Sequence, residues 1–265
     1  EIDRQVVHAL ARLHTHRGGA VTLLRPNSNG MISYDVTEDH QASTMSWQAT
    51  NREAGMIQEL PAPKDGRAIF ADMTASFPIH RLPESWDSAV WDPRSFGGPQ
   101  GIALIGIARE GSWRNPGPEL DKRRVYGSFS KPLLLATAVA LENWVKSSQI
   151  EMERLEKLHQ LLSGELQKRI SSAHVVLPPK RDPRYFAFVI DNVIAEEVLR
   201  KVELEGFLID AGSACGAGAL SPSHVLTSMG YKPDGNFRIT LKPHHSEADC
   251  VALVDALVKG VAAST

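Results

Sequence analysis

Apolar residues recur in two rhythms along this chain. In the first half, short apolar runs alternate with glycine, proline and polar residues, which is typical of strands in a sheet covered on both faces. These runs are residues 21–24, 45–49, 68–72, 89–91 and 102–107. A helix is predicted before them, over residues 2–14. Its apolar residues fall on one face: Val6, Val7, Leu10 and Leu13.

The second half begins with a long helical stretch over residues 133–170, after a polar segment at 111–124 that predicts a surface loop. Shorter elements follow. Strands are predicted at 175–177, 186–190, 207–210 and 237–241, and helices at 193–205, 221–229 and 246–261. Ser246 is the expected N-cap of the last helix, because Glu247 and Asp249 in its first turn suit the helix dipole. The predicted apolar face of that helix is Val251, Leu253, Val254, Leu257 and Val258.

This order of elements predicts an α/β protein with a larger N-terminal layer and a smaller α+β C-terminal layer. We expect a partial large α/β domain at 1–130, connecting helices at 131–172 and a small α+β domain at 173–265. The length of 265 residues allows one large domain or two modest ones.

The composition is that of an ordinary globular protein, with 42% hydrophobic and 23% charged residues. A net charge of −2 gives no reason to expect nucleic acid or an anionic membrane as a partner. No apolar run has the length of a membrane span, and Arg and Asp interrupt the N-terminus as they would not in a signal peptide. The two cysteines, Cys215 and Cys250, lie in different contexts, so we expect no disulfide framework and a cytoplasmic location.

Three motifs near the C-terminus carry a resemblance. They read GSAC at residues 212–215, LSPSHVL at 220–226 and FRITL at 237–241. This series resembles the C-terminal part of the cysteine desulfurases, which are pyridoxal phosphate (PLP) enzymes of the class V aminotransferase family. The resemblance covers essentially the whole chain and implies the PLP-dependent transferase fold type I. It begins part-way into the family's large domain, so the implied large domain is truncated and lacks the first phosphate-binding loop.

The resemblance also implies roles for individual residues. Asn51 stands where an asparagine faces the cofactor ring and the substrate. Asp72 stands where a carboxylate pairs with the pyridinium nitrogen, which keeps the ring an electron sink. Ser128 replaces a threonine that reaches a phosphate across a dimer interface. Arg238 matches an arginine that holds the substrate carboxylate, and Cys215 matches the cysteine that takes sulfur as a persulfide.

Other positions depart from the family pattern. Ser95 stands at the position of the lysine that binds PLP covalently, and a serine cannot form an imine. Asp92 replaces a serine or threonine that donates to phosphate, and its charge would repel that group. Arg94 replaces a histidine, Ala75 a glutamine, and Asp3 a histidine that stacks on the ring. We therefore expect PLP to be held without a covalent bond or not at all.

Each candidate has a plainer interpretation. Arg238 would form an ordinary salt bridge with a surface carboxylate, and Asp72 would cap a turn at the end of its strand. Cys250 falls on the apolar side of the last helix, where we expect it to be buried and unreactive. The histidines near the first helix, at positions 8, 14 and 16, lack the spacing of metal ligands, so no metal site is predicted.

Two functions remain open. The preferred hypothesis is a degenerate cysteine desulfurase homologue that acts as a binding or regulatory partner in sulfur metabolism. It would form a homodimer, or a heterodimer with an active paralogue, and could contact a sulfur-acceptor protein. The alternative is a cysteine desulfurase or a persulfide-carrying sulfurtransferase that uses Cys215. A working desulfurase would need its lysine from elsewhere, such as Lys64 or a partner subunit.

Overall fold

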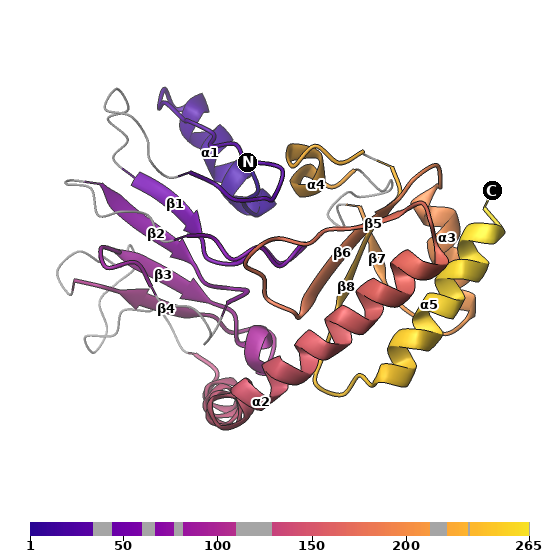
Figure 1. The fold of residues 1–265 in the computed structure, drawn as a ribbon. Helices are drawn as coiled ribbons and strands as arrows, with labels where there is room; N and C mark the ends of the chain where they lie inside the picture. Colours follow the sequence, from indigo (N-terminus) through magenta and orange to yellow (C-terminus); the bar gives the residue numbers. More distant parts are fainter. Residues whose placement is uncertain are drawn as a thin grey trace. The chain divides into compact units, whose positions relative to one another are not determined.

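The computed structural model describes residues 1–33, 44–59, 67–76, 82–109, 129–212, 222–232 and 234–264. The chain folds into two compact units (Figure 1). The first, here called the C-terminal unit, comprises Glu1–Ser33, Asn51–Gln58 and Gln149–Thr265. The second, the parallel-sheet unit, comprises Tyr34–Thr50 and Glu59–Ser148. The predicted domain boundaries at residues 130 and 172 remain predictions.

A four-stranded sheet forms the centre of the parallel-sheet unit. Its strands are β1 (Thr44–Gln48), β2 (Ala68–Asp72), β3 (Ser88–Trp91) and β4 (Leu104–Ile107), in the order β1-β2-β3-β4. The first three are parallel to one another, and β4 pairs antiparallel with β3. The core includes Trp47, Ile69, Ala71 and Ala89, which lie in the apolar runs that predicted these strands, together with Met73 just after β2.

The long helix α2 (Lys131–Arg169) begins in the parallel-sheet unit and ends in the C-terminal unit. The sequence predicted a long helical stretch over residues 133–170, written as connecting helices at 131–172, and the structure forms one continuous helix of 39 residues there. No proline follows Pro132 inside it, and Pro132 lies in the first turn, where a missing N–H costs nothing. A single continuous helix is therefore compatible with every residue in the segment.

An antiparallel sheet forms the centre of the C-terminal unit. Its strands are β5 (Ala173–Val175), β6 (Tyr185–Ile190), β7 (Asp210–Ala211) and β8 (Asn236–Thr240), in the order β5-β6-β8-β7. Every residue of β6 is buried. Alternate residues of this strand enter two different clusters, so both faces of the sheet are covered.

Helices cover one face of this sheet. The second part of α2 packs there with α3 (Ala195–Leu204) and α5 (Glu247–Ala262), as Figure 1 shows. The rings of Phe188 and Phe237 stack at 5.1 Å between their centroids within this core. On the opposite face, Ala187 and Val189 pack with Ile2 of the N-terminal segment, Met56 of the segment 51–58 and Leu226 of α4 (His224–Ser228).

The predicted N-cap of α5 is confirmed. The Ser246 hydroxyl accepts a hydrogen bond from the Asp249 backbone N–H at 3.2 Å, and the Asp249 carboxylate accepts one from the Ser246 N–H at 2.8 Å. This reciprocal pair is a capping box, which satisfies two backbone donors at once. The predicted apolar face is confirmed for Leu253, Val254 and Leu257, but Val251 is exposed.

Two predicted strands were wrong. Residues 21–24 form no strand, because their backbone has no ladder partner among the described residues; instead, the Leu24 carbonyl accepts a hydrogen bond from the N-terminal ammonium at 2.7 Å. Of residues 207–210, only Asp210 joins a ladder, as the first residue of the two-residue strand β7. Both segments carry strand-forming residues, but a strand also needs a neighbour in register. The loop predicted at 111–124 lies outside the described residues.

Candidate functional site

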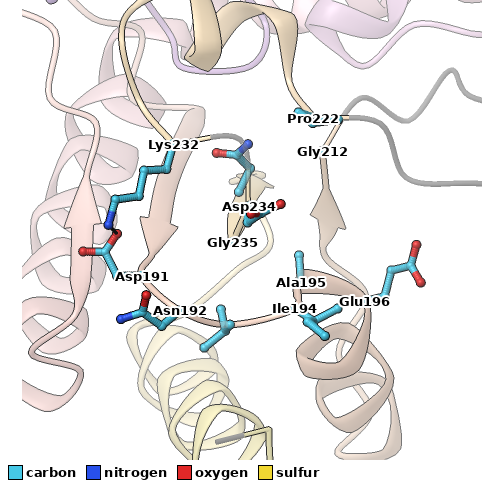
Figure 2. Close-up of a pocket in the computed structure, with 12 residues that line it drawn as sticks. Asp191, Asn192, Ile194, Ala195, Glu196, Gly212, Pro222, Lys232, Asp234 and Gly235 are labelled. Atoms are coloured by element: carbon cyan, nitrogen blue, oxygen red, sulfur yellow. Dashed lines mark ion pairs between the residues drawn. The ribbon is translucent and has the colours of Figure 1, made fainter.

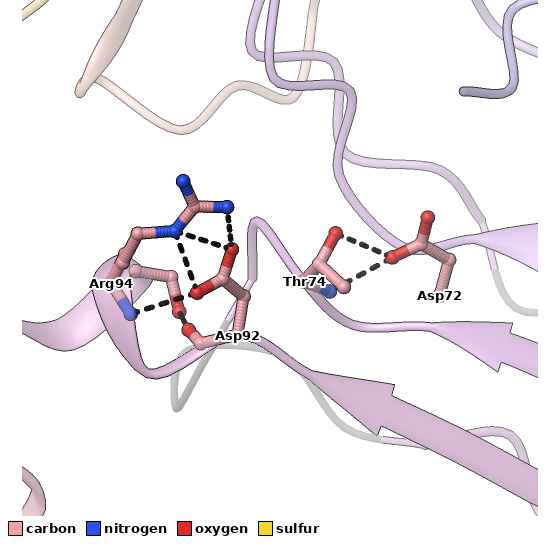
Figure 3. A network of polar contacts seen from close by, with 5 residues as sticks. Asp72, Thr74, Asp92 and Arg94 are labelled. Atoms are coloured by element: carbon pink, nitrogen blue, oxygen red, sulfur yellow. Dashed lines mark hydrogen bonds and ion pairs between the residues drawn. The ribbon is translucent and has the colours of Figure 1, made fainter. Parts of the chain in front are cut away.

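The carboxyl ends of β2 and β3 lie side by side in the parallel-sheet unit, since Asp72 of β2 pairs in register with Val90 of β3. Ligands of open α/β sheets bind at this edge. Asp72 is buried, and its Oδ1 accepts hydrogen bonds from the Thr74 backbone N–H at 2.9 Å and the Thr74 hydroxyl at 2.6 Å (Figure 3). The carboxylate therefore caps the turn that follows β2, as the plainer interpretation predicted.

Asp92 follows β3 and leads into the 3-10 helix η1 (Pro93–Phe96). Its carboxylate accepts three kinds of hydrogen bond from Arg94: from the backbone N–H at 3.0 Å, from Nε at 3.0 and 3.1 Å, and from a terminal guanidinium nitrogen at 2.6 Å (Figure 3). The hydrogen bonds and charge of Asp92 raise the pKa of Arg94. Each side chain thus neutralises the other.

Ser95 is the next residue of η1. Its hydroxyl donates a hydrogen bond to the Asp92 carbonyl at 2.7 Å, so the side chain turns back onto the chain that precedes it. Gly97 then ends the helix with a φ of 80°, a left-handed conformation that glycine adopts without strain. The residues from 92 to 98 offer a carboxylate, a guanidinium and a hydroxyl, but no amine.

Asn51 belongs to the C-terminal unit. Its side chain is buried, and Oδ1 accepts hydrogen bonds from the backbone N–H groups of Glu53 at 2.9 Å and Ala54 at 3.2 Å. Its Nδ2 donates to the Ile2 carbonyl at 3.1 Å. The amide therefore holds the turn over residues 51–55 and ties it to the N-terminal segment. A ligand-binding role for Asn51 remains a prediction.

Arg238 lies on β8, on the sheet face that Ala187 shares, because these two residues are directly opposite in the ladder. Its Nε forms a salt bridge with the Asp210 carboxylate at 3.3 Å across to β7. The Asp210 side chain is 63% exposed. The salt bridge with a surface carboxylate is therefore present, and any other carboxylate that approaches Arg238 would have to compete with Asp210.

A second carboxyl group, that of Glu53, also lies within the electrostatic reach of Arg238. Glu53 is buried, and burial raises its pKa, while a hydrogen bond with Ser223 and the charges of Arg238 and His224 act in the opposite direction. Ser223 is itself the N-cap of α4, since its hydroxyl accepts from the Leu226 N–H at 3.1 Å. The sequence placed Glu53 beside Asn51 in the same short segment but predicted no role for it.

Cys250 is buried in α5, as predicted, and burial raises the pKa of its thiol. A thiol with a raised pKa is mostly protonated at neutral pH and is a poor nucleophile. The predicted persulfide residue Cys215 and the predicted phosphate-binding residue Ser128 both lie outside the described residues.

A cavity of about 380 Å³ opens in the C-terminal unit beside the start of α3 (Figure 2). Charged residues of both signs line it, among them Asp191, Glu196, Lys232 and Asp234. The ammonium of Lys232 lies 3.0 Å from the Asp191 carboxylate. Asn51, Asp72, Ser95 and Arg238, the predicted site residues that the structure describes, do not line this cavity.

Comparison with known proteins identifies the fold. No family model matches the chain. It is 29% identical over 258 residues to the cysteine desulfurase IscS of Dictyoglomus turgidum, covering 91% of this chain. It is 26% identical to the cysteine desulfurase IscS 1 of Archaeoglobus fulgidus, covering 97% of this chain and 71% of the relative. The chain spans 65% of the length of the Dictyoglomus protein, which is just under two thirds.

Solved structures agree. A NifS-like protein superposes with a TM-score of 0.83 at 19% identity, over 98% of this chain and 73% of its own. The cysteine desulfurase CsdA of Escherichia coli superposes with a TM-score of 0.75 at 15% identity, over 96% of this chain and 68% of its own. The fold is that of the cysteine desulfurase-like class V aminotransferases. The predicted fold class is confirmed.

The desulfurase-like fold implies PLP, and the residues after β3 allow a test of fit. Covalent attachment needs a primary amine, and the 92–98 segment has none. Arg94 is the cationic side chain in this segment. Its charge is already balanced by the Asp92 carboxylate, so it is a weak partner for a phosphate. This segment does not fit covalently bound PLP. Asp72, by contrast, is a buried carboxylate at the end of β2, a residue type that suits a pyridinium nitrogen.

Among the described residues, no three His, Cys, Asp or Glu side chains are grouped so that they could hold a metal ion. Across the same part of the chain, none of the helices combines the length and apolar character that crossing a membrane requires.

Proposed function

We propose that this chain is a degenerate cysteine desulfurase homologue that does not bind PLP covalently and acts as a binding or regulatory partner in sulfur metabolism. The main support for this proposal is the Asp92–Arg94 ion pair after β3. The next residue, Ser95, donates its hydroxyl to the Asp92 carbonyl. A carboxylate and its own guanidinium partner occupy the segment where the resemblance expects an amine and a phosphate donor.

Electrostatics supports this proposal. A phosphate needs donors and net positive charge around it. The Arg94 charge is compensated by Asp92 at 2.6 Å, so a phosphate arriving there would first have to break a bidentate pair. The repulsion expected from Asp92 alone is reduced by this pairing, but the pair itself has no net positive charge to offer a phosphate.

The proposed partner is a second copy of this chain or an active paralogue. Support comes from the likeness to cysteine desulfurases in sequence and fold. A sulfur-acceptor protein is a further proposed contact. The second copy, the active paralogue and the sulfur acceptor are all proposed from the family resemblance. The chain spans only 65% of the length of the Dictyoglomus relative.

The test is an absorbance titration of the purified protein with PLP, together with an assay for alanine release from L-cysteine. We expect no visible absorption of lysine-bound PLP and no alanine above the rate of a PLP-only solution. Ser95→Ala should behave like the parent protein, because the Ser95 hydroxyl donates to the Asp92 carbonyl at the start of η1 and takes no part in chemistry in this account. Alanine release at a desulfurase rate would refute the proposal.

A second candidate is a persulfide carrier that uses Cys215. The favouring observation is that Cys250 is buried with a raised thiol pKa, so the reactive thiol of a two-cysteine chain would be Cys215. Thiol labelling tests it. Cys250→Ser should keep rapid labelling and accept persulfide from a donor, whereas Cys215→Ser should lose both. Labelling of Cys215 no faster than free cysteine would remove this candidate.

A further inference from the structure

The buried histidine of α2, His159, has no hydrogen-bond partner in the described part of the chain for either ring nitrogen. The residue is 1% exposed, and its ring meets that of Phe186 edge-on, with 4.8 Å between the ring centroids. A buried polar group without a partner costs free energy, whereas an apolar side chain of similar size would fill the same place without that cost. Packing alone therefore does not explain an imidazole at this position.

Two side chains of opposite charge act on this imidazole. Glu156 lies three residues before His159 on α2, a spacing that places both side chains on the same face of the helix. Arg181, in the segment between β5 and β6, donates a hydrogen bond from a terminal guanidinium nitrogen to the Glu156 carboxylate. The Nε of Arg181 is buried and has no partner among the described residues. A proton on His159 would therefore give Glu156 a second cation to pair with.

The remaining charges near His159 are already paired. Asp182 also acts on the imidazole, but its carboxylate is held by Arg184, in an ion pair whose side chains are at most 6% exposed. Strand β6, which packs against the ring, contains no carboxylate and no cationic residue. Burial and the Arg181 charge lower the pKa of His159 from 6.5 to about 4, and the carboxylates of Glu156 and Asp182 oppose that shift without cancelling it. His159 is therefore neutral at pH 7, and Glu156 is the carboxylate that a protonated His159 can recruit.

The segment that contains Arg181 holds residues 51–58 in place. Three backbone contacts join the two segments: the Arg181–Met56 bridge, the Ile57 N–H donating to the Lys180 carbonyl at 3.0 Å, and the Asp182 N–H donating to the Gly55 carbonyl at 2.9 Å. The ion pair with Glu156 ties the same segment to α2. That ion pair therefore fixes the backbone on which residues 51–58 depend.

Residues 51–58 include two residues of the candidate site. Asn51 joins them to the N-terminal segment, because its Nδ2 donates at 3.1 Å to a carbonyl that precedes α1 (Gln5–His16). Glu53 forms a hydrogen bond with the N-cap residue of α4 and lies within electrostatic reach of Arg238. A shift of residues 51–58 would therefore change the surroundings of Arg238.

We propose that His159 is a proton-sensitive latch on residues 51–58. When His159 takes up a proton from solvent, the Glu156 carboxylate turns from Arg181 to the imidazolium. Arg181 then lacks its charge partner and lies beside a second cation, so residues 180–182 release residues 51–58. This regulation of the candidate site goes beyond the proposed function and does not depend on whether PLP binds.

The latch is closed at neutral pH and opens in acid. Because the pKa of His159 in the closed form lies below its ordinary value of 6.5, protons favour the open form below that pH. One proton taken up on opening lowers the protection of the held amides by up to about tenfold for each pH unit. The loss should begin near pH 6.5 and level off near pH 4, where the closed form is protonated as well.

Hydrogen exchange of the full 265-residue chain tests the latch. The reporters are the amides of Ile57 and Asp182, whose hydrogen bonds join the two segments. After correction for the intrinsic effect of pH on exchange, their protection should fall about tenfold between pH 7 and pH 5. Low concentrations of urea should leave this exchange unchanged, because a local opening exposes little surface, whereas amides of β6 should exchange faster as urea is added.

Matched variants assign the latch to its residues. His159→Leu should keep its protection at pH 5, whereas the control His174→Leu, at an exposed position of β5, should lose it as the parent does. Glu156→Gln should lower the protection severalfold at pH 7 and flatten the pH dependence, because it removes the carboxylate from both forms. Its control is Glu153→Gln, since the Glu153 carboxylate accepts a hydrogen bond from Gln149 in the same helix.

Each of four results contradicts the latch. Protection at Ile57 and Asp182 could stay constant with pH, or His159→Leu could lose it in acid as the parent does. The exchange of these amides could rise with urea as steeply as that of β6, which would make global unfolding the cause. Glu156→Gln could behave like Glu153→Gln. This last comparison holds whether or not the core tolerates leucine in place of His159, because the Glu156 side chain is 34% exposed.

Discussion

At the residue scale, the charged groups at the end of β3 and in β8 are already paired within the chain. Asp92 holds Arg94, and Asp210 holds Arg238. These pairs differ in kind. The first is bidentate and joins residues two apart on one turn, whereas the second is a single contact to an exposed carboxylate. Displacing Asp210 from Arg238 should therefore cost less free energy than displacing Asp92 from Arg94.

Asp210 should therefore act as a competitor for carboxylate ligands of Arg238. We propose, from the family resemblance, that Arg238 binds the carboxylate of L-cysteine. Replacing Asp210 by Asn removes a pair worth up to about 1 kcal/mol, so on this proposal the affinity for L-cysteine should rise about two- to fivefold. Isothermal titration calorimetry measures the change, and Arg238→Ala should abolish binding in either background. If Asp210→Asn leaves the affinity unchanged while Arg238→Ala removes it, the competition does not exist.

The ion pair of Asp182 and Arg184 is buried, so breaking it should be costly, unlike breaking the exposed Asp210–Arg238 pair. Burial alone would lower the pKa of Arg184, but the charge and hydrogen bonds of Asp182 more than reverse that effect, so the pKa is raised. Arg184→Leu leaves the Asp182 carboxylate buried without its charge partner and should cost about 3–5 kcal/mol in the free energy of unfolding.

Urea denaturation measures that loss. The control is the double change Asp182→Asn with Arg184→Leu, which removes both charges and should recover much of the stability. Equal losses in the single and double variants would mean that the packing of Arg184, rather than the unpaired charge, sets its contribution.

His159 predicts a pH dependence. It is 1% exposed against the ring of Phe186, and neither ring nitrogen bonds to another described residue. Burial, aided by the Arg181 charge and opposed by Glu156 and Asp182, lowers its pKa from 6.5 to about 4. Between pH 4 and pH 6.5, His159 is therefore protonated in the unfolded chain but neutral in the folded chain. Stability is fully present above pH 6.5 and falls as the pH drops toward 4.

The loss attributable to His159 is about 3 kcal/mol at most. His159→Leu should abolish this part of the acid sensitivity, as judged from urea midpoints between pH 7 and pH 4. His174→Leu is the matched control, because His174 is exposed and paired with Asp191, and it should keep the acid loss. An unchanged acid profile in His159→Leu would show that other groups cause it.

At the scale of elements, α5 depends on its capping box. Ser246→Ala removes the acceptor for the Asp249 N–H and should lower the free energy of unfolding by about 1 kcal/mol. Ser147→Ala on α2 is the control, since the Ser147 hydroxyl donates to the Asn143 carbonyl in the same helix and caps no helix end. Guanidinium denaturation compares them. Equal losses in the two variants would deny the cap its role.

The elements also show what a single sequence can and cannot predict. The run at residues 68–72 matches β2 to the residue, because it is buried on a sheet whose neighbours lie on both sides. Residues 21–24 have a similar apolar character, yet they form no strand. Apolar periodicity indicates that a segment tends to form a strand. Whether it does so also depends on a pairing strand from a distant part of the chain.

The candidate site divides in the same way. The identities of Asp92, Arg94 and Ser95 came from the sequence, and these decide whether an amine is present. Their mutual hydrogen bonds did not, because they depend on the turn into η1. Glu53 was given no role for a related reason: its burial and its hydrogen bond with Ser223 depend on distant parts of the chain.

At the scale of the whole molecule, resemblance predicted more than periodicity did. The motifs at 212–215, 220–226 and 237–241 led to a desulfurase-like fold that the solved structures confirm. The division of the chain into its two compact units could not be predicted from the sequence. Residues 51–58 belong to the C-terminal unit although β1 immediately before them belongs to the other. Hydrogen bonds to residues 180–182 hold this segment, and such distant pairing leaves no local pattern.

The central claim is that this chain does not attach PLP to a lysine. The most direct measurement is intact-protein and peptide mass spectrometry after incubation with excess PLP, dilution to release weakly bound cofactor, and borohydride reduction. The account predicts an unmodified chain, apart from scattered traces on exposed lysines. Stoichiometric modification of one lysine, such as Lys64, would contradict it.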